Sequence, residues 1–146
     1  MGSRASAGQY RPSAPIMGAG EMRVIVTGGR DYVPTYKDFI LLRDALWELR
    51  TTCVVHGGAA GVDQWAGKSA KTLGFCVSVF PYRGDLGRAG GHVRNQEMVD
   101  TAHACIHLTG GAGTADCVRR ATKAGLSIVA LHPDTSPSPP QQTELF

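Results

Sequence analysis

The chain has 146 residues, with 15 Lys and Arg against 12 Asp and Glu and a formal net charge of +3. This length suits one ordinary domain, and the mild basic excess alone does not indicate a nucleic-acid-binding protein. No apolar stretch is long enough for a transmembrane helix, and no secretory signal is recognisable. The cysteines show no C-x-x-C spacing, so we expect reduced thiols, no metal site and a cytoplasmic protein.

The two ends of the chain differ in composition from its middle. Residues 1–21 are rich in Gly, Ala, Ser and Pro and have no periodicity, so we expect a flexible leader. Residues 133–146 are predicted to form a Pro/Ser linker that ends in a short peptide motif. The folded domain is therefore expected over residues 22–132.

Short apolar runs alternate with helical periodicity through this middle segment. The predicted elements are a strand at 23–27, a helix at about 35–50, a strand at 53–56, a helix at about 61–73, a strand at 75–80, a helix at about 93–102, a strand at 104–108, a helix at 113–125 and a strand at 127–131. This alternation predicts an α/β fold: a Rossmann-like, doubly wound, mostly parallel five-stranded sheet of order 3-2-1-4-5, with helices on both faces.

The first predicted helix has one apolar face, formed by Phe39, Leu42, Leu46 and Leu49. We interpret this face as part of the core. Trp47 on the same helix is also interpreted as a packing residue, not as a platform for a ligand.

Three of the predicted strands end in a pair of glycines that leads into a helix. We call these the first glycine turn (Gly28–Tyr32), the second glycine turn (Gly57–Gly61) and the third glycine turn (Gly110–Gly113). Glycine lets the backbone turn sharply and leaves room beside the N–H groups at the start of the next helix, which suits phosphate. In the predicted strand order all three turns line one crevice at the carboxyl edge of the sheet.

The second and third glycine turns resemble each other in sequence. Asp63 and Asp116 each follow the first glycine of their turn by six residues, and each is expected in the first turn of its helix. Either acid complements the helix dipole, or it binds ribose hydroxyls or positions water. Thr114 either donates its hydroxyl to phosphate or satisfies its own backbone.

Cationic side chains accompany the turns. Arg30 is expected to bind an anion, and Tyr32 is expected to stack on a base or ribose. Arg94 and Asn95 are expected to begin a helix that points toward the crevice. The Gly- and Arg-rich loop before that helix either closes over an anionic ligand or is a solvated mobile loop. The candidate ligand-binding residues are Gly28, Gly29, Arg30, Asp31, Tyr32, Gly57, Gly58, Ala59, Gly61, Asp63, Arg94, Asn95, Gly110, Gly111, Gly113, Thr114 and Asp116.

A nucleotide-binding motif and a hydrolase motif are both excluded. The segment from Gly61 to Gly67-Lys68-Ser69 has one residue too many for a Walker A motif and lies inside a predicted helix. No Gly-x-Ser-x-Gly elbow is present, so a Ser or Cys nucleophile with a His base is not visible.

Taken together, the ordered motifs resemble a known family. The three turns with their flanking residues, together with Arg94-Asn95, are similar to the YspA-type, YpsA-related branch of the SLOG superfamily over about residues 22–132. This resemblance implies a Rossmann-like fold, a nucleotide or nucleotide-derived ligand, a homodimer and a phage or bacterial setting. The candidate residues themselves require no metal or cofactor. Many members of the superfamily resemble sensors more than enzymes.

The same resemblance bears on catalysis. Lonely Guy phosphoribohydrolases carry two acids after their Gly-Gly-x-Gly-Thr motif, and the second is catalytic; here Asp116 matches the first, and Cys117 stands at the second. Ligand binding is therefore the favoured reading. The alternatives are a nucleotide N-glycosidase that uses Asp116 or Asp63, and a DprA-like single-strand DNA binder.

The last six residues carry a separate motif. Gln142, Leu145 and Phe146 form a Gln-x-x-Leu-Phe pattern that resembles peptides bound by bacterial sliding clamps. In such peptides Gln makes polar contacts and the Leu-Phe pair fills an apolar pocket. We therefore expect a tether to a DNA replication clamp.

Overall fold

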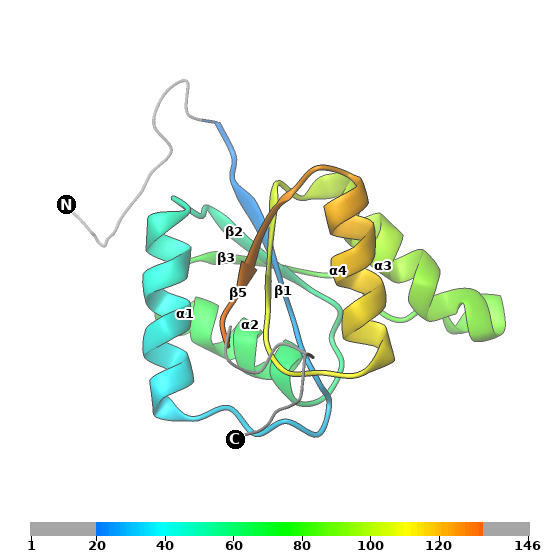
Figure 1. The fold of residues 1–146 in the computed structure, drawn as a ribbon, viewed down its shortest axis with the longest axis horizontal. Coiled ribbons are helices and arrows are strands. Elements are labelled where there is room, and N and C mark those ends of the chain that lie inside the picture. Colours follow the sequence, from blue (N-terminus) through cyan, green and yellow to red (C-terminus); the bar gives the residue numbers. More distant parts are fainter. Residues whose placement is uncertain (1–19, 133–146) are drawn as a thin grey trace, which may run out of the picture.

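The computed structural model describes residues 20–132. These residues form one parallel sheet of order β3-β2-β1-β4-β5 (Figure 1), which confirms the predicted doubly wound fold. The elements are β1 (Arg23–Thr27), α1 (Tyr36–Glu48), β2 (Cys53–His56), α2 (Val62–Thr72), β3 (Cys76–Val79), the 3₁₀ helix η2 (Gly84–Ala89), α3 (Gly90–Thr101), β4 (Ala104–His107), α4 (Ala112–Lys123) and β5 (Ser127–Ala130).

The sheet is covered on both faces. Helices α1 and α2 pack on one face and α3 and α4 on the other (Figure 1). Along β1, Val24 and Val26 point into the α1–α2 core, whereas Ile25 points into the α3–α4 core, and all three are fully buried. A central strand buried on both sides explains why β1 reads as a continuous apolar run.

Helix α1 begins with a reciprocal cap. The Thr35 hydroxyl accepts from the backbone N–H of Asp38, and the Asp38 carboxylate accepts from the backbone N–H of Thr35. Leu42 and Leu46 are fully buried, as the periodicity predicted. The interpretation of Trp47 was wrong: its side chain is 56% exposed and lies under the guanidinium of Arg43 on the outer face of α1.

The segment between β3 and α3 is helical where a loop was expected. Residues Gly84–Ala89 form η2, and α3 begins at Gly90, earlier than the predicted start. The guanidinium of Arg83 explains part of this order, because it pairs with Glu97 at 2.8 Å and with Asp85 at 3.3 Å. The pair with Glu97 ties the segment to α3, and both pairs engage one of the arginines of the Gly- and Arg-rich segment.

The predicted leader lies almost entirely outside the described residues, and the predicted linker and its peptide motif lie wholly outside them. Within residues 20–132, none of the helices combines the length and the apolar character needed to cross a membrane.

Candidate functional site

The sheet register brings the three glycine turns to one edge. Gly29 of the first turn donates its N–H to the carbonyl of Thr109, just before the third turn, at 2.8 Å. Its own carbonyl accepts from the N–H of Val62, just after the second turn, at 3.2 Å. The first turn is therefore hydrogen-bonded to both neighbours, as expected for the carboxyl ends of adjacent parallel strands.

Several of the glycines make this close contact possible. A Cβ at Gly61 would lie 2.5 Å from the carbonyl oxygens of Gly29 and Arg30, and Gly61 also has a φ of +77°. A Cβ at Gly28 would lie 2.7 Å from the Val62 side chain. These glycines serve the packing of turn against turn, and they do not open space for a ligand.

The second glycine turn is filled by side chains of the protein itself. The buried carboxylate of Asp63 accepts from the N–H of Gly57 at 3.1 Å and from that of Ala59 at 3.3 Å. The N–H between them, that of Gly58, donates to Nδ1 of His56 at 3.0 Å. Asp63 thus occupies the position that an anion would take, which a sequence comparison of the turns does not reveal.

Electrostatics agree with this internal role. Burial raises the pKa of Asp63, although the two backbone donors and the guanidinium groups of Arg94 and Arg30 act in the opposite direction. Burial, with a smaller contribution from Lys71, lowers the pKa of His56, so the ring is neutral at pH 7 and its Nδ1 is available as an acceptor.

Arg94 and Asn95 connect the second turn to the third. Arg94 donates to the carbonyl of Gly57 at 2.7 Å and to Oδ1 of Asn95 at 3.0 Å. Asn95, which is buried, donates in turn to the carbonyl of Gly113 at 3.2 Å and to the carboxylate of Asp116 at 3.0 Å. The two residues predicted from sequence therefore form a polar bridge beneath the turns.

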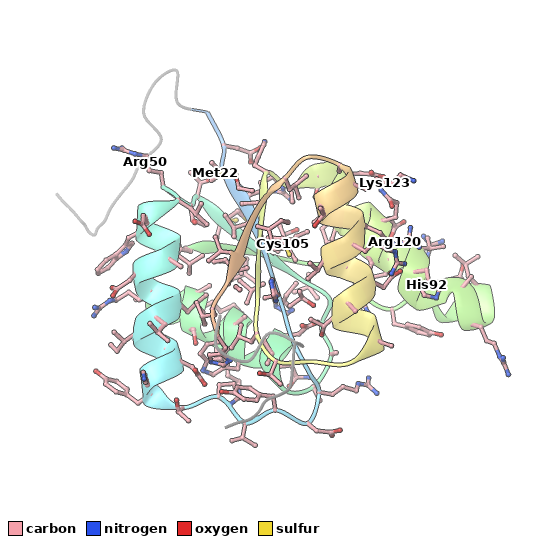
Figure 2. All side chains as sticks on the ribbon, viewed as in Figure 1. Met22, Arg50, His92, Cys105, Arg120 and Lys123 are labelled. Atoms are coloured by element: carbon pink, nitrogen blue, oxygen red, sulfur yellow. The ribbon has the colours of Figure 1, made fainter. Side chains whose placement is uncertain are left out.

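Asp116 is held between α3 and α4. It is the fifth residue of α4, not in the first turn as expected, and it is 2% exposed. Besides Asn95, it is bound by Arg119, by Arg120 at 2.9 Å and by His92 at 3.2 Å. Figure 2 shows His92 and Arg120 on this side of the molecule.

The charge of Asp116 is fully engaged by these partners. Burial alone raises its pKa, but hydrogen bonds from Asn95, Arg120 and His92 outweigh burial and hold the pKa well below the usual range of a carboxyl. Asp116 is therefore an ionised link between two helices.

The third glycine turn is more open than the second. Helix α4 begins with Gly111 as N-cap and has no capping side chain, and nothing lies within 4 Å of a Cβ built on Gly111 or Gly113. Thr114 is buried, with its hydroxyl against Gly110. No side chain thus caps the first N–H groups of α4 within the described residues.

A cleft of about 320 Å³ lies beside the first and second turns. Its lining includes two arginines, Arg30 and Arg94. Its lining residues are Arg30, Gly57, Gly58, Ala59, Val79, Pro81, Tyr82 and Arg94. Arg30 is exposed and makes no ion pair with any residue in the described part of the chain.

The apolar wall of this cleft was missed by the sequence analysis. Val79 and Tyr82 are 51% and 55% exposed, and Pro81 lies between them in the chain. The signal was available, because Val79 ends the strand that neighbours β2, and Pro81 and Tyr82 follow it at the same edge of the sheet.

Tyr32 and Asp31 of the first turn have different surroundings. Asp31 is exposed. Tyr32 is partly buried, packs against the α1–α2 core and donates its hydroxyl to Asp38 at 2.8 Å, so one side of its ring is already engaged. Among residues 20–132, no group of three His, Cys, Asp or Glu side chains gathers in a way that could hold a metal ion.

The comparisons with known proteins identify relatives of this chain. The Gene 61 protein of Mycobacterium phage D29 is 37% identical over 121 residues, which cover 73% of this chain and 94% of the relative. An uncharacterized protein of Archaeoglobus fulgidus is 31% identical over 90 residues, which cover 55% of this chain and 60% of that relative. No protein-family model matches, and no solved structure matches. Since the first match spans nearly all of the phage protein, the chain belongs to the family of the Gene 61 protein of Mycobacterium phage D29.

Proposed function

We propose that this protein binds a nucleotide or a nucleotide-derived ligand at the carboxyl edge of its sheet, as a sensor or by sequestering the ligand. The observation that carries this proposal is the cleft beside the glycine turns, which is lined both by two arginines, Arg30 and Arg94, and by the exposed apolar residues Val79 and Tyr82. A nucleotide has the same two-part character, with an anionic phosphate and an apolar, stackable base.

The phosphate end of the ligand is assigned to Arg30, which lines the cleft, and to the start of α4, which lies on the other side of the first turn. The second turn is excluded, because Asp63 and His56 already accept from the N–H groups of Gly57, Gly58 and Ala59. Arg30 lacks an ion-pair partner among residues 20–132, and α4 begins without a capping side chain. A guanidinium and a helix N-terminus both favour phosphate oxygens.

The base or sugar is assigned to the wall formed by Val79, Pro81 and Tyr82. An aromatic ring and two aliphatic side chains offer a surface on which a planar base stacks, with a stabilisation of about 1–3 kcal/mol per base in comparable sites. The Tyr82 hydroxyl donates to the carbonyl of Gly87 at 2.7 Å, which fixes the orientation of the ring.

Binding is favoured over hydrolysis of the ligand. An N-glycosidase of the Lonely Guy type needs a carboxylate that faces the sugar. Here Asp63 accepts from two N–H groups of its own turn, and Asp116 is held by side chains of α3 and α4. The similarity to the SLOG superfamily supports the same choice.

The proposal is tested by calorimetric titration with nucleoside mono-, di- and triphosphates, NAD and a short single-stranded oligonucleotide. We expect Arg30→Ala to weaken nucleotide binding about 10-fold or more, because a charge-assisted contact contributes about 1.5–3 kcal/mol. Lys123→Ala is the matched control, since it removes the same charge at the opposite end of α4 (Figure 2). Absence of binding by the wild-type protein, or an equal loss in both variants, contradicts the proposal.

Two measurements with the same ligands distinguish the alternatives. Release of free base, detected by chromatography and abolished by Asp116→Asn, identifies a glycosidase. Binding of the oligonucleotide alone, with strong weakening by salt, identifies a single-strand DNA binder.

We further propose that Gln142, Leu145 and Phe146 tether the protein to a bacterial sliding clamp; these residues lie outside the described part of the chain. Replacement of both Leu145 and Phe146 by Ala is expected to abolish capture of the protein by immobilised clamp. Thr143→Ala, within the same peptide, is expected to leave capture unchanged. Equal capture of all variants contradicts the tether.

A further inference from the structure

A second group of reactive side chains lies next to the third glycine turn. Nε2 of His132 lies 2.6 Å from Oδ1 of Asp38, and Nδ1 of the same ring lies 3.4 Å from the hydroxyl of Thr109. The hydroxyl of Tyr32 and the N–H of Thr35 both donate to Oδ2 of Asp38 at 2.8 Å. An acid, an imidazole and a hydroxyl are thus connected in series.

The topology of the sheet explains how residues so far apart in sequence meet. Strands β4 and β5 pair in parallel with His107 opposite Ala130. Two residues beyond this pair in each segment, the same register brings Thr109 opposite His132. Asp38 reaches the pair from the first turn of α1, where it is the acid of the helix cap.

The hydrogen bonds define the tautomer of the imidazole. Asp38 is 3% exposed; burial raises its pKa, but hydrogen bonds from His132, Thr35 and Tyr32 outweigh burial, and the pKa is lowered. An ionised carboxylate only accepts, so Nε2 of His132 carries the proton shared with Asp38. In the neutral ring Nδ1 is then unprotonated and accepts from the Thr109 hydroxyl, which is the arrangement of a base that activates a nucleophile.

Thr109 is both fixed and accessible. Its carbonyl accepts from the N–H of Gly29 at 2.8 Å, which anchors the backbone, whereas the residue itself is exposed. It is followed by Gly110 and by Gly111, the uncapped N-terminus of α4. N–H groups at such a position stabilise negative charge that develops on an oxygen beside the nucleophile.

We propose that Asp38, His132 and Thr109 form a catalytic triad that hydrolyses carboxylic esters. Oγ of Thr109 attacks the carbonyl carbon while its proton passes to Nδ1 of His132. The carbon–oxygen bond to the alcohol breaks, and His132 returns the proton to the alcohol oxygen. Water then attacks the threonyl ester with His132 as base, which releases the carboxylic acid and restores Thr109. Asp38 is a positioning residue that holds the ring and stabilises its protonated form.

This activity is tested on the full chain with a fluorophosphonate probe and with 4-nitrophenyl acetate. We expect loss of fluoride and a covalent phosphonyl adduct that peptide mapping assigns to Thr109. Thr109→Val is expected to abolish the adduct, and Thr109→Ser to retain it. His132→Gln is expected to slow adduct formation and ester hydrolysis about 100-fold or more, since a general base contributes about 10²–10⁴-fold.

The controls separate catalysis from folding and from background reactivity. His103→Gln removes an exposed imidazole at the opposite end of the sheet and is expected to leave both rates unchanged. Circular dichroism melting verifies that each variant is folded. If His132→Gln melts early, Thr109→Val, which keeps the side-chain shape, provides the test of the triad. An adduct on another residue, or unchanged rates in folded His132→Gln, overturns the proposal. Arg30→Ala is expected to leave the adduct intact, because this centre does not depend on nucleotide binding.

Discussion

Replacement of Asp63 by Ala tests whether the second glycine turn is held by an internal anion. The substitution removes the acceptor for the N–H groups of Gly57 and Ala59, which lie 3.1 Å and 3.3 Å from the carboxylate. Each buried donor left without a partner costs about 1–3 kcal/mol, whereas removal of a desolvated charge returns part of this. We therefore expect Asp63→Ala to lower the free energy of unfolding by about 2–4 kcal/mol.

Urea unfolding at pH 7 measures this loss directly. For a domain of this size about 1 kcal/mol corresponds to about 4 °C in Tm, so the melting temperature is expected to fall by roughly 8–16 °C. Asp31→Ala is the matched control, because Asp31 is exposed in the neighbouring first turn and its loss is expected to change stability by less than about 0.5 kcal/mol.

The variant is also expected to gain a site for an anion. With the carboxylate gone, the N–H groups of Gly57 and Ala59 face an empty position next to Arg94, whose guanidinium donates to the Gly57 carbonyl. Inorganic phosphate at about 100 times its Kd stabilises a folded protein by about 2.7 kcal/mol, so phosphate is expected to raise the Tm of Asp63→Ala more than that of the wild type. Equal stability of the two Asp→Ala variants, or equal phosphate shifts in wild type and Asp63→Ala, refutes the reasoning.

Three further predictions concern stability. Gly61→Ala is expected to cost at least about 2 kcal/mol in urea unfolding, because its φ is +77° and its Cβ would meet two carbonyl oxygens at 2.5 Å. The lowered pKa of Asp116 means that its stabilisation is present above the unfolded value of 3.8 and is lost as pH falls below it, so Asp116→Asn is expected to flatten the acid limb of stability against pH. Leu46→Ala is expected to cost about 2–5 kcal/mol, whereas Trp47→Ala, which loses mainly the contact with Arg43, costs less than about 1 kcal/mol in the same assay.

The sequence predicted the fold and the meeting of the three turns, because both follow from the alternation of strands and helices. It did not predict the different uses of Asp63 and Asp116, which have the same spacing from their glycines. Gly61 has a positive φ and stays outside α2, so Asp63 is the second residue of its helix, whereas α4 already begins at Ala112 and Asp116 is its fifth residue. A shift of three residues moves a side chain about 4.5 Å along a helix and onto another face.

Two other features depended on tertiary contacts that periodicity does not encode. Trp47 is one residue away from the buried Leu46, and nothing packs over the outer face of α1 within the described residues to bury it. Similarly, the series from Asp38 through His132 to Thr109 depends on the register of β4 against β5. No local motif connects residues separated by 94 and 23 positions.

The two proposed activities share the mouth of the third glycine turn, and this makes their relation measurable. Thr109 immediately precedes the glycines that lead into α4, and its carbonyl is bonded to Gly29, the neighbour of Arg30. We therefore expect a phosphate held by Arg30 and the first N–H groups of α4 to cover the Thr109 hydroxyl. We expect a saturating nucleotide to slow phosphonylation of Thr109 about 10-fold in the wild type, and to lose this protection in Arg30→Ala, since that variant binds nucleotide more weakly. Full labelling of the wild type in the presence of bound nucleotide would instead confine the ligand to the Tyr82 side of the cleft and refute a shared mouth.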